Sequence, residues 1–123
     1  MQPTSTDVQD HNLTDWLALA KSHKTELFDL IEKLVLIETP TSDKAANDYI
    51  SSIAADLMKS LGGDVKVHTQ DKYGDHVTAE WPSSEGGTNQ HAFIVGHLDT
   101  VWPIGTLERM GYAEQDGRLY GPG

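Results

Sequence analysis

A short apolar run, Ala92 to Val95, leads directly into Gly96-His97-Leu98-Asp99. An apolar run bounded by polar residues is typical of a buried strand, and we expect this one to be central in a sheet. Ligands of open α/β sheets bind at the carboxyl ends of the strands, which is where His97 and Asp99 fall. The pattern therefore predicts a functional site at the end of a buried strand.

The spacing of His97 and Asp99 indicates how the two side chains cooperate. In an extended backbone, residues i and i+2 project to the same side, so the Asp99 carboxylate can approach the imidazole of His97. A carboxylate on one ring nitrogen fixes the tautomer and makes the other nitrogen a better metal ligand. We interpret His97 as a candidate metal ligand and Asp99 as its support. Because His-x-Asp is a short motif, an ordinary hydrogen-bonded histidine at a strand end is the alternative.

Composition limits the class of protein and of site. The 123 residues suffice for one small domain, and 19 acidic against 9 basic side chains give a net charge of -10. Binding to phosphates needs clustered Lys and Arg, so this balance argues against nucleic-acid partners and anionic membrane surfaces. Cysteine is absent, so a metal site would use His, Asp and Glu, which suits zinc, manganese or cobalt.

The first residues give an expectation about location. Residues 1–12 are polar and lack apolar periodicity, so we expect a flexible tail. They have neither the basic start nor the apolar segment of a secretory signal, and no stretch of the sequence is long enough to cross a membrane. A cytoplasmic protein is the expectation.

Periodicity predicts the elements of the N-terminal half. Apolar residues at helical spacing begin at Leu13 and predict either one long helix or two helices joined near Ser22-His23, ending before Pro40. A second helix follows, with Thr41 or Ser42 as its cap, and ends at Gly62-Gly63.

Strand patterns dominate the remainder. Alternation around Val65–Val67 and Val77–Trp81 predicts an antiparallel pair, followed by a polar loop over Pro82–Asn89. Asp116-Gly117 predicts a hairpin between Tyr112–Gln115 and Arg118–Tyr120, after a long connection from Trp102 to Met110. The expected fold class is α/β, a mixed sheet with helices packed on it.

Three segments together resemble a known family. Gly96 to Val101, Gly105-Thr106-Leu107 and Asp116 to Gly123 are similar to the signature of the zinc aminoacylase and carboxypeptidase family of metallopeptidases. Within that family, Val101 to Leu107 is most similar to the glutamate carboxypeptidase branch. The resemblance extends over Leu27 to Gly123.

The resemblance implies a hydrolase that uses two metal ions, zinc in the first place, with cobalt or manganese as alternatives. By position, His97 would ligate one zinc ion and Asp99 would be the catalytic residue that holds its imidazole. In the family, the bridging aspartate, the Glu-Glu pair and the lid domain follow the Gly-Pro-Gly turn at Gly121-Pro122-Gly123. The resemblance thus implies that residues 13–123 are the N-terminal part of a catalytic domain, inactive alone, and that a homodimer would form through the lid.

The implied substrates are small peptides or N-acyl amino acids, with release of a C-terminal glutamate or a similar amino acid. The alternative is a non-catalytic α/β module that binds a partner or a single metal ion. Five other polar or aromatic residues near the motifs are expected to be surface or packing residues: His76, His91, Trp102, Glu108 and Arg109.

Overall fold

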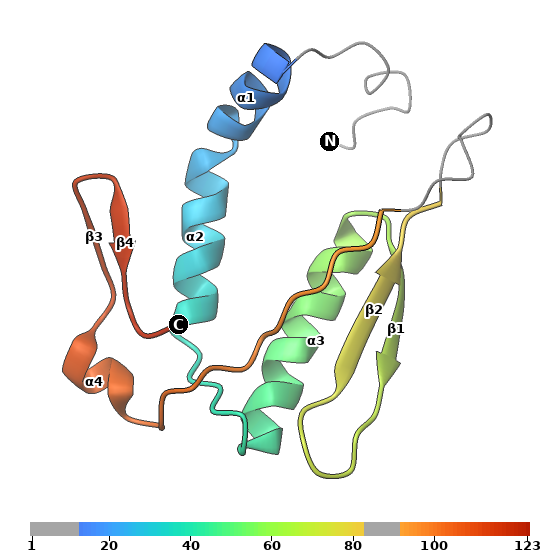
Figure 1. Cartoon of the computed structure of the whole chain (residues 1–123), viewed down its shortest axis with the longest axis vertical. Coiled ribbons are helices and arrows are strands. Elements are labelled where there is room, and N and C mark those ends of the chain that lie inside the picture. Colours follow the sequence, from blue (N-terminus) through green and yellow to red (C-terminus); the bar gives the residue numbers. More distant parts are fainter. Residues whose placement is uncertain (1–12, 83–91) are drawn as a thin grey trace. The chain divides into compact units, whose positions relative to one another are not determined.

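The computed structural model describes residues 13–82 and 92–123. The predicted tail and the predicted loop after Pro82 lie outside the described residues, and so does His91. The chain divides into two units, residues 1–33 and residues 34–123. Its elements, labelled in Figure 1, are α1 Leu13–Ser22, α2 Lys24–Val35, α3 Lys44–Ser60, β1 Asp64–His68, β2 His76–Glu80, α4 Thr106–Met110, β3 Ala113–Gln115 and β4 Arg118–Tyr120.

Helices and small sheets make this a mixed α/β fold, as the sequence predicts. Both sheets are two-stranded and antiparallel, one formed by β1 and β2 and the other by β3 and β4. Within the described ranges, no helix has the length and apolar character that crossing a membrane requires.

The first apolar stripe forms two helices, and the predicted break is at His23. The Ser22 hydroxyl donates to the Leu19 carbonyl at 2.7 Å, and the His23 ring lies 2.7 Å from the Glu26 carboxylate. These local side-chain bonds compete with regular helical bonding where α1 meets α2. None of the residues of α2 is buried, and Leu27 is half exposed.

Helix α3 begins one or two residues later than predicted. Asp43, in extended conformation, is the N-cap, because its carboxylate accepts the Ala46 N–H at 3.0 Å. The prediction of Thr41 or Ser42 as the cap is therefore wrong, and Thr41 has a different partner, described below. At the other end, Gly62 adopts a φ of 83° and donates its N–H to Lys59, which confirms the predicted glycine stop.

The core of the larger unit lies where α3 packs against β1 and β2 (Figure 1). Ile50, Ala54 and Ala55 are buried on the inner face of α3. The strands form the predicted antiparallel pair, with Val65 opposite Ala79. Helical spacing on α3 and alternation on the strands thus place one apolar face of each element at this contact.

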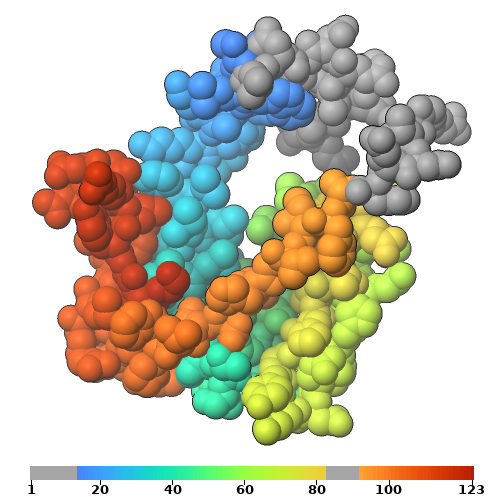
Figure 2. All heavy atoms as spheres, in the orientation of Figure 1, coloured from blue at the N-terminus to red at the C-terminus, as the bar shows by residue number. Residues whose placement is uncertain are grey.

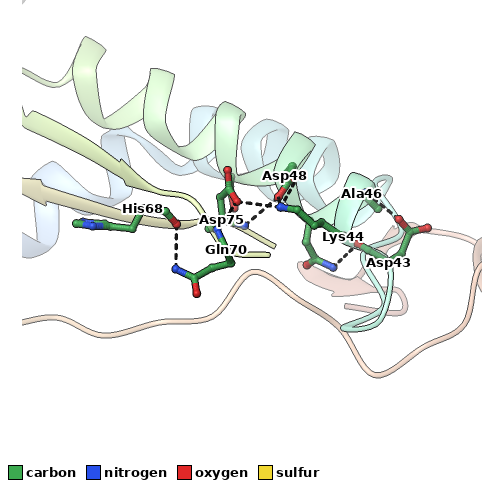
Figure 3. A network of polar contacts seen from close by, with 9 residues as sticks. Asp43, Lys44, Ala46, Asp48, His68, Gln70 and Asp75 are labelled. Carbon is green, nitrogen blue, oxygen red and sulfur yellow. Dashed lines mark hydrogen bonds and ion pairs between the residues drawn. The ribbon is translucent and has the colours of Figure 1, made fainter. Parts of the chain in front are cut away.

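A polar network joins the start of α3 to the turn before β2 (Figure 3). The Lys44 ammonium lies 2.9 Å from oxygens of both Asp48 and Asp75. The Asp75 carboxylate also accepts the Gln70 N–H at 2.9 Å, and buried Ser51 donates to the Asp75 carbonyl at 2.8 Å. The hairpin turn is therefore fixed to the helix by charged hydrogen bonds as well as by apolar packing.

The prediction of a buried central strand at Ala92–Val95 is wrong for this structure. The segment belongs to no ladder, and Phe93, Ile94 and Val95 are 89%, 92% and 77% exposed. Figure 2 shows its atoms (orange) lying open on this face. An apolar run shows that a segment has side chains suited to burial, but a buried strand also needs neighbouring strands. Among the described strands, β1 and β2 pair only with each other.

The C-terminal part contains one element that was not predicted. The connection after Trp102 includes the short helix α4, whereas the β3–β4 hairpin has the expected turn. Asp116 and Gly117 have φ values of 52° and 72°, the left-handed conformation that a two-residue hairpin of this kind needs at both positions.

Candidate functional site

The candidate site is built on a segment that we call the site strap, Glu38 to Thr41, which lies beside Leu98–Thr100. Thr39 is fully buried; its hydroxyl donates to the Leu98 carbonyl at 3.0 Å, and its carbonyl accepts the Thr100 N–H at 2.8 Å. Pro40 and Thr100 form an isolated parallel bridge. Thr39 thus holds the backbone on both sides of Asp99.

The Asp99 carboxylate is held by the second threonine of the strap. Thr41 Oγ1 donates to Asp99 Oδ2 at 2.5 Å, and Asp99 Oδ1 lies 3.3 Å from His97 Nδ1. The hydrogen bond from Thr41, followed by that from the Asp99 backbone N–H and then by the contribution of His97, holds the pKa of Asp99 below its usual value, against an opposing effect of partial burial. Asp99 is therefore an ionised and oriented carboxylate.

The geometry at His97 indicates which ring nitrogen carries the proton. Nδ1 lies 2.8 Å from the backbone carbonyl oxygen of Asp99. A carbonyl oxygen can only accept, so Nδ1 is the donor, and in the neutral ring Nε2 carries the free lone pair. The His97 side chain is 83% exposed, which leaves Nε2 accessible. The predicted approach of Asp99 to His97 is thus present, with the Asp99 main chain as the closer acceptor.

The loop that follows the site is held by Glu38, at the start of the strap. Its two carboxylate oxygens accept the N–H groups of Gly105 and Leu107 at 2.8 and 2.9 Å. These bonds, with that from Gly105 first, hold the pKa of Glu38 below its usual value. A carboxylate at the N-terminus of a helix satisfies N–H groups that have no partner within the helix, so Glu38 caps α4 from a distant part of the chain.

His97 has the donor chemistry of a single metal ligand, but the described residues do not form a complete metal site. Nowhere in residues 13–82 and 92–123 do three or more His, Cys, Asp or Glu side chains gather closely enough to hold an ion. Zinc sites normally have at least three protein ligands. An open hollow beside the strap is lined by Pro40, Ser42, Asp43, Lys44, Pro103 and Ile104, and includes neither His97 nor Asp99.

Of the other residues singled out from the sequence, those that the structure describes lie on the surface. His76 begins β2 opposite His68, whose ring nitrogen lies 2.9 Å from the Thr78 hydroxyl. Glu108 and Arg109 are exposed on α4, and Trp102 is 43% exposed. Of these residues, Arg109 interacts with the strap, because its charge adds to the hydrogen bonds that lower the pKa of Glu38.

Sequence reasoning missed the three strap residues that contact the site and its loop. The sequence pattern predicts Thr41 only as a possible helix cap and predicts no role for Glu38 or Thr39. The partners of Thr39 and Thr41 lie 59 and 58 residues away, and those of Glu38 lie 67 and 69 residues away. Local patterns carry no signal for such pairings.

Comparison with known proteins leaves the site to be interpreted from its geometry: no protein-family model, curated protein or solved structure matches this chain.

Proposed function

We propose that this chain contributes the His97–Asp99 pair of a metal-dependent hydrolase that cleaves peptide or amide bonds. The observation that supports the proposal is the state of the His97 ring. Nδ1 donates to Asp99, and Nε2 is left with an accessible lone pair, as a ligating histidine requires. The order and spacing of the motifs from Gly96 to Gly123 point to the same chemistry.

In this proposal the residues of the chain have distinct tasks. His97 would bind the metal through Nε2, and Asp99 orients the ring and maintains its tautomer. A bound metal ion of this kind lowers the pKa of a water molecule and polarises the substrate carbonyl. The remaining ligands and the general base would come from outside the described residues. Zinc, with cobalt or manganese as substitutes, and a cytoplasmic location belong to the same proposal.

The proposed substrates are small peptides and N-acyl amino acids that end in glutamate or a similar acidic residue. This part depends on the resemblance of Val101 to Leu107 to the glutamate carboxypeptidase branch. In the structure, the Glu38 carboxylate holds Gly105 and Leu107 of this segment by their N–H groups. A rate comparison between N-acyl-glutamate and N-acyl-ornithine substrates tests it, and faster cleavage of the ornithine compound would contradict it.

A second candidate function rests on the exposed His97 ring, which offers one free nitrogen. A non-catalytic module that binds a partner or one metal ion also accounts for such a site. The gene sequence around the region that encodes these residues separates the two. An aspartate and then a Glu-Glu pair downstream of Gly123 supports the hydrolase, and their absence from the coding sequence supports the module.

Zinc titration tests the role of His97 directly. We expect the loss of this ligand in His97→Ala to abolish the heat of zinc binding at this site in calorimetry. His76→Ala is the matched control, because His76 is also exposed and begins a segment of extended chain. Equal zinc binding by wild type and His97→Ala would contradict the proposal.

A further inference from the structure

The geometry points to Thr41 as a positioning residue that holds Asp99 and, through Asp99, the Nδ1–H tautomer of His97. The connection consists of two measured contacts, 2.5 Å from Thr41 Oγ1 to Asp99 Oδ2 and 3.3 Å from Asp99 Oδ1 to His97 Nδ1. The importance of Thr41 for metal binding rests on the proposed function, whereas its effect on the His97 tautomer does not.

Thr41 can position another residue because its own backbone is held. The preceding carbonyl, that of Pro40, accepts the Asn47 side-chain amide and the Asp43 N–H, each at 2.8 Å. Asn47 is buried, and its amide also donates to the Asp43 carbonyl at 2.8 Å. The Thr41 hydroxyl therefore projects from a turn that α3 fixes at several points.

The two threonines of the strap divide the task of placing Asp99. Thr39 fixes the main chain on both sides of it, through Leu98 and Thr100, but leaves the carboxylate free to rotate. Thr41 binds one carboxylate oxygen and so stops that rotation. The other oxygen is then directed at His97.

This placement matters because imidazole has a choice of tautomer. A neutral histidine without partners favours the proton on Nε2, the nitrogen that a metal would need, so acceptors must be supplied at Nδ1. The Asp99 carbonyl is one acceptor and Asp99 Oδ1 is the second. Without the Thr41 hydroxyl, we expect the second acceptor to rotate away and the Nδ1–H tautomer to lose population.

The test is NMR of the imidazole nitrogens in the full metal-free chain, at a pH well above about 6.5, where a histidine is ordinarily neutral. His97→Gln assigns the signal. In Thr41→Val we expect the ratio of Nδ1–H to Nε2–H in His97 to fall by about fivefold, the factor for one hydrogen bond of ordinary strength. Thr41→Ser, which keeps the hydroxyl, should retain the wild-type ratio.

Thr78→Val is the matched control, because it removes another exposed threonine hydroxyl that contacts a histidine, His68. It should leave the His97 ratio unchanged. Since Thr41 is itself exposed, we expect its variants to keep the fold, which the backbone amide spectrum verifies. Thr41→Ala, without the branched side chain, is the second variant should Thr41→Val lose the fold.

Two results would overturn the inference: a His97 ring that is mainly Nε2–H in the wild type, or an unchanged ratio in a folded Thr41→Val or Thr41→Ala variant. Zinc titration of the wild type separates this inference from the proposed function. A shifted tautomer, together with zinc binding that His97→Ala leaves unchanged, would keep Thr41 as a positioning residue and remove the metal site. Zinc binding with an unshifted tautomer would keep the metal site and remove the positioning role of Thr41.

Discussion

Lys44 and Asp75, 31 residues apart in the sequence, meet in an ion pair at 2.9 Å between Nζ and Oδ1. The contact connects the first turn of α3 to the residue before β2, and Asp48 joins it from the next turn of the helix (Figure 3). Because the Asp75 side chain is only 18% exposed, the pair is shielded more than a typical surface ion pair. It sets the orientation of the hairpin against the helix that carries the site strap at its start.

This pair predicts how stability depends on acid. The Gln70 N–H and then the Lys44 ammonium hold the pKa of Asp75 below its ordinary value of 3.8. A carboxylate with a lowered pKa in the folded state contributes its full stability above pH 3.8 and loses it as the pH falls through the lower folded value. We expect Asp75→Asn to be less stable than wild type at neutral pH, with a difference that shrinks below pH 3.8.

Urea unfolding at a series of pH values measures this difference. Asp71→Asn is the control, since Asp71 is an exposed carboxylate in the same turn and should not change the acid dependence. A difference between Asp75→Asn and wild type that stays constant into acid would contradict the role of the ionised pair.

The close packing of Gly74 against Asn47 leads to a second prediction about stability. A Cβ added at Gly74 would overlap the Cβ of Asn47, which is buried and hydrogen-bonded to Pro40 and Asp43 and so cannot move aside. We expect Gly74→Ala to lower the free energy of unfolding by about 1–3 kcal/mol, the usual cost of overpacking. Gly96→Ala is the control, because its Cβ would meet nothing within 4 Å. Equal stability of the two variants in urea would contradict this account.

The parts of the fold that the sequence predicts are those with local causes. The apolar stripe of α3, the alternation in β1 and β2 and the Asp116-Gly117 turn each depend on neighbouring residues, and each is present as expected. Helix α4 is too short for periodicity to indicate, and its cap, Glu38, lies far away in the sequence. Such an element is determined by tertiary contact alone.

The candidate site divides in the same way. The i and i+2 spacing of His97 and Asp99 predicts their approach, and the two residues do meet. The contacts of Thr39 and Thr41 join segments almost sixty residues apart, so no local rule indicates them. The buried strand was inferred from apolar character alone, and the exposure of Ile94 shows that this inference needs a partner strand as well.

The exposed apolar segment predicts a solubility effect. Phe93, Ile94 and Val95 present apolar side chains to solvent in a segment that belongs to none of the described strands, and exposed apolar segments of high strand propensity promote association between chains. Ile94→Lys should raise the soluble concentration measured by light scattering and change the free energy of unfolding by less than about 0.5 kcal/mol. Tyr49→Lys, an equivalent charge change at an exposed residue of α3, should give a smaller gain. Equal gains would remove this segment as the cause of association.

Asp99 predicts a loss of metal affinity without loss of fold. Asp99→Asn keeps the shape of the side chain but removes the negative charge of the carboxylate that Thr41 and His97 contact. Loss of such a supporting carboxylate typically costs about 10–100-fold in metal affinity or activity. Competition of the folded variant with a zinc indicator measures the change. Unaltered affinity would leave Asp99 with a structural role only.

We expect residues 1–123 alone to have no measurable hydrolase activity. Metal-assisted hydrolysis needs a firmly held ion and a base within hydrogen-bond reach of the attacking water. Here His97 offers one nitrogen, Asp99 is engaged with Thr41 and His97, and the described residues contain no group of three ligating side chains. With one ligand in place of three, zinc should bind weakly, and a weakly held ion does not activate water well. The assay uses N-acyl-glutamate with the purified chain at a zinc excess, and His97→Ala purified in parallel reveals any contaminating peptidase. Tight stoichiometric zinc binding together with turnover that His97→Ala abolishes would show that these residues are sufficient for catalysis and that the prediction is wrong.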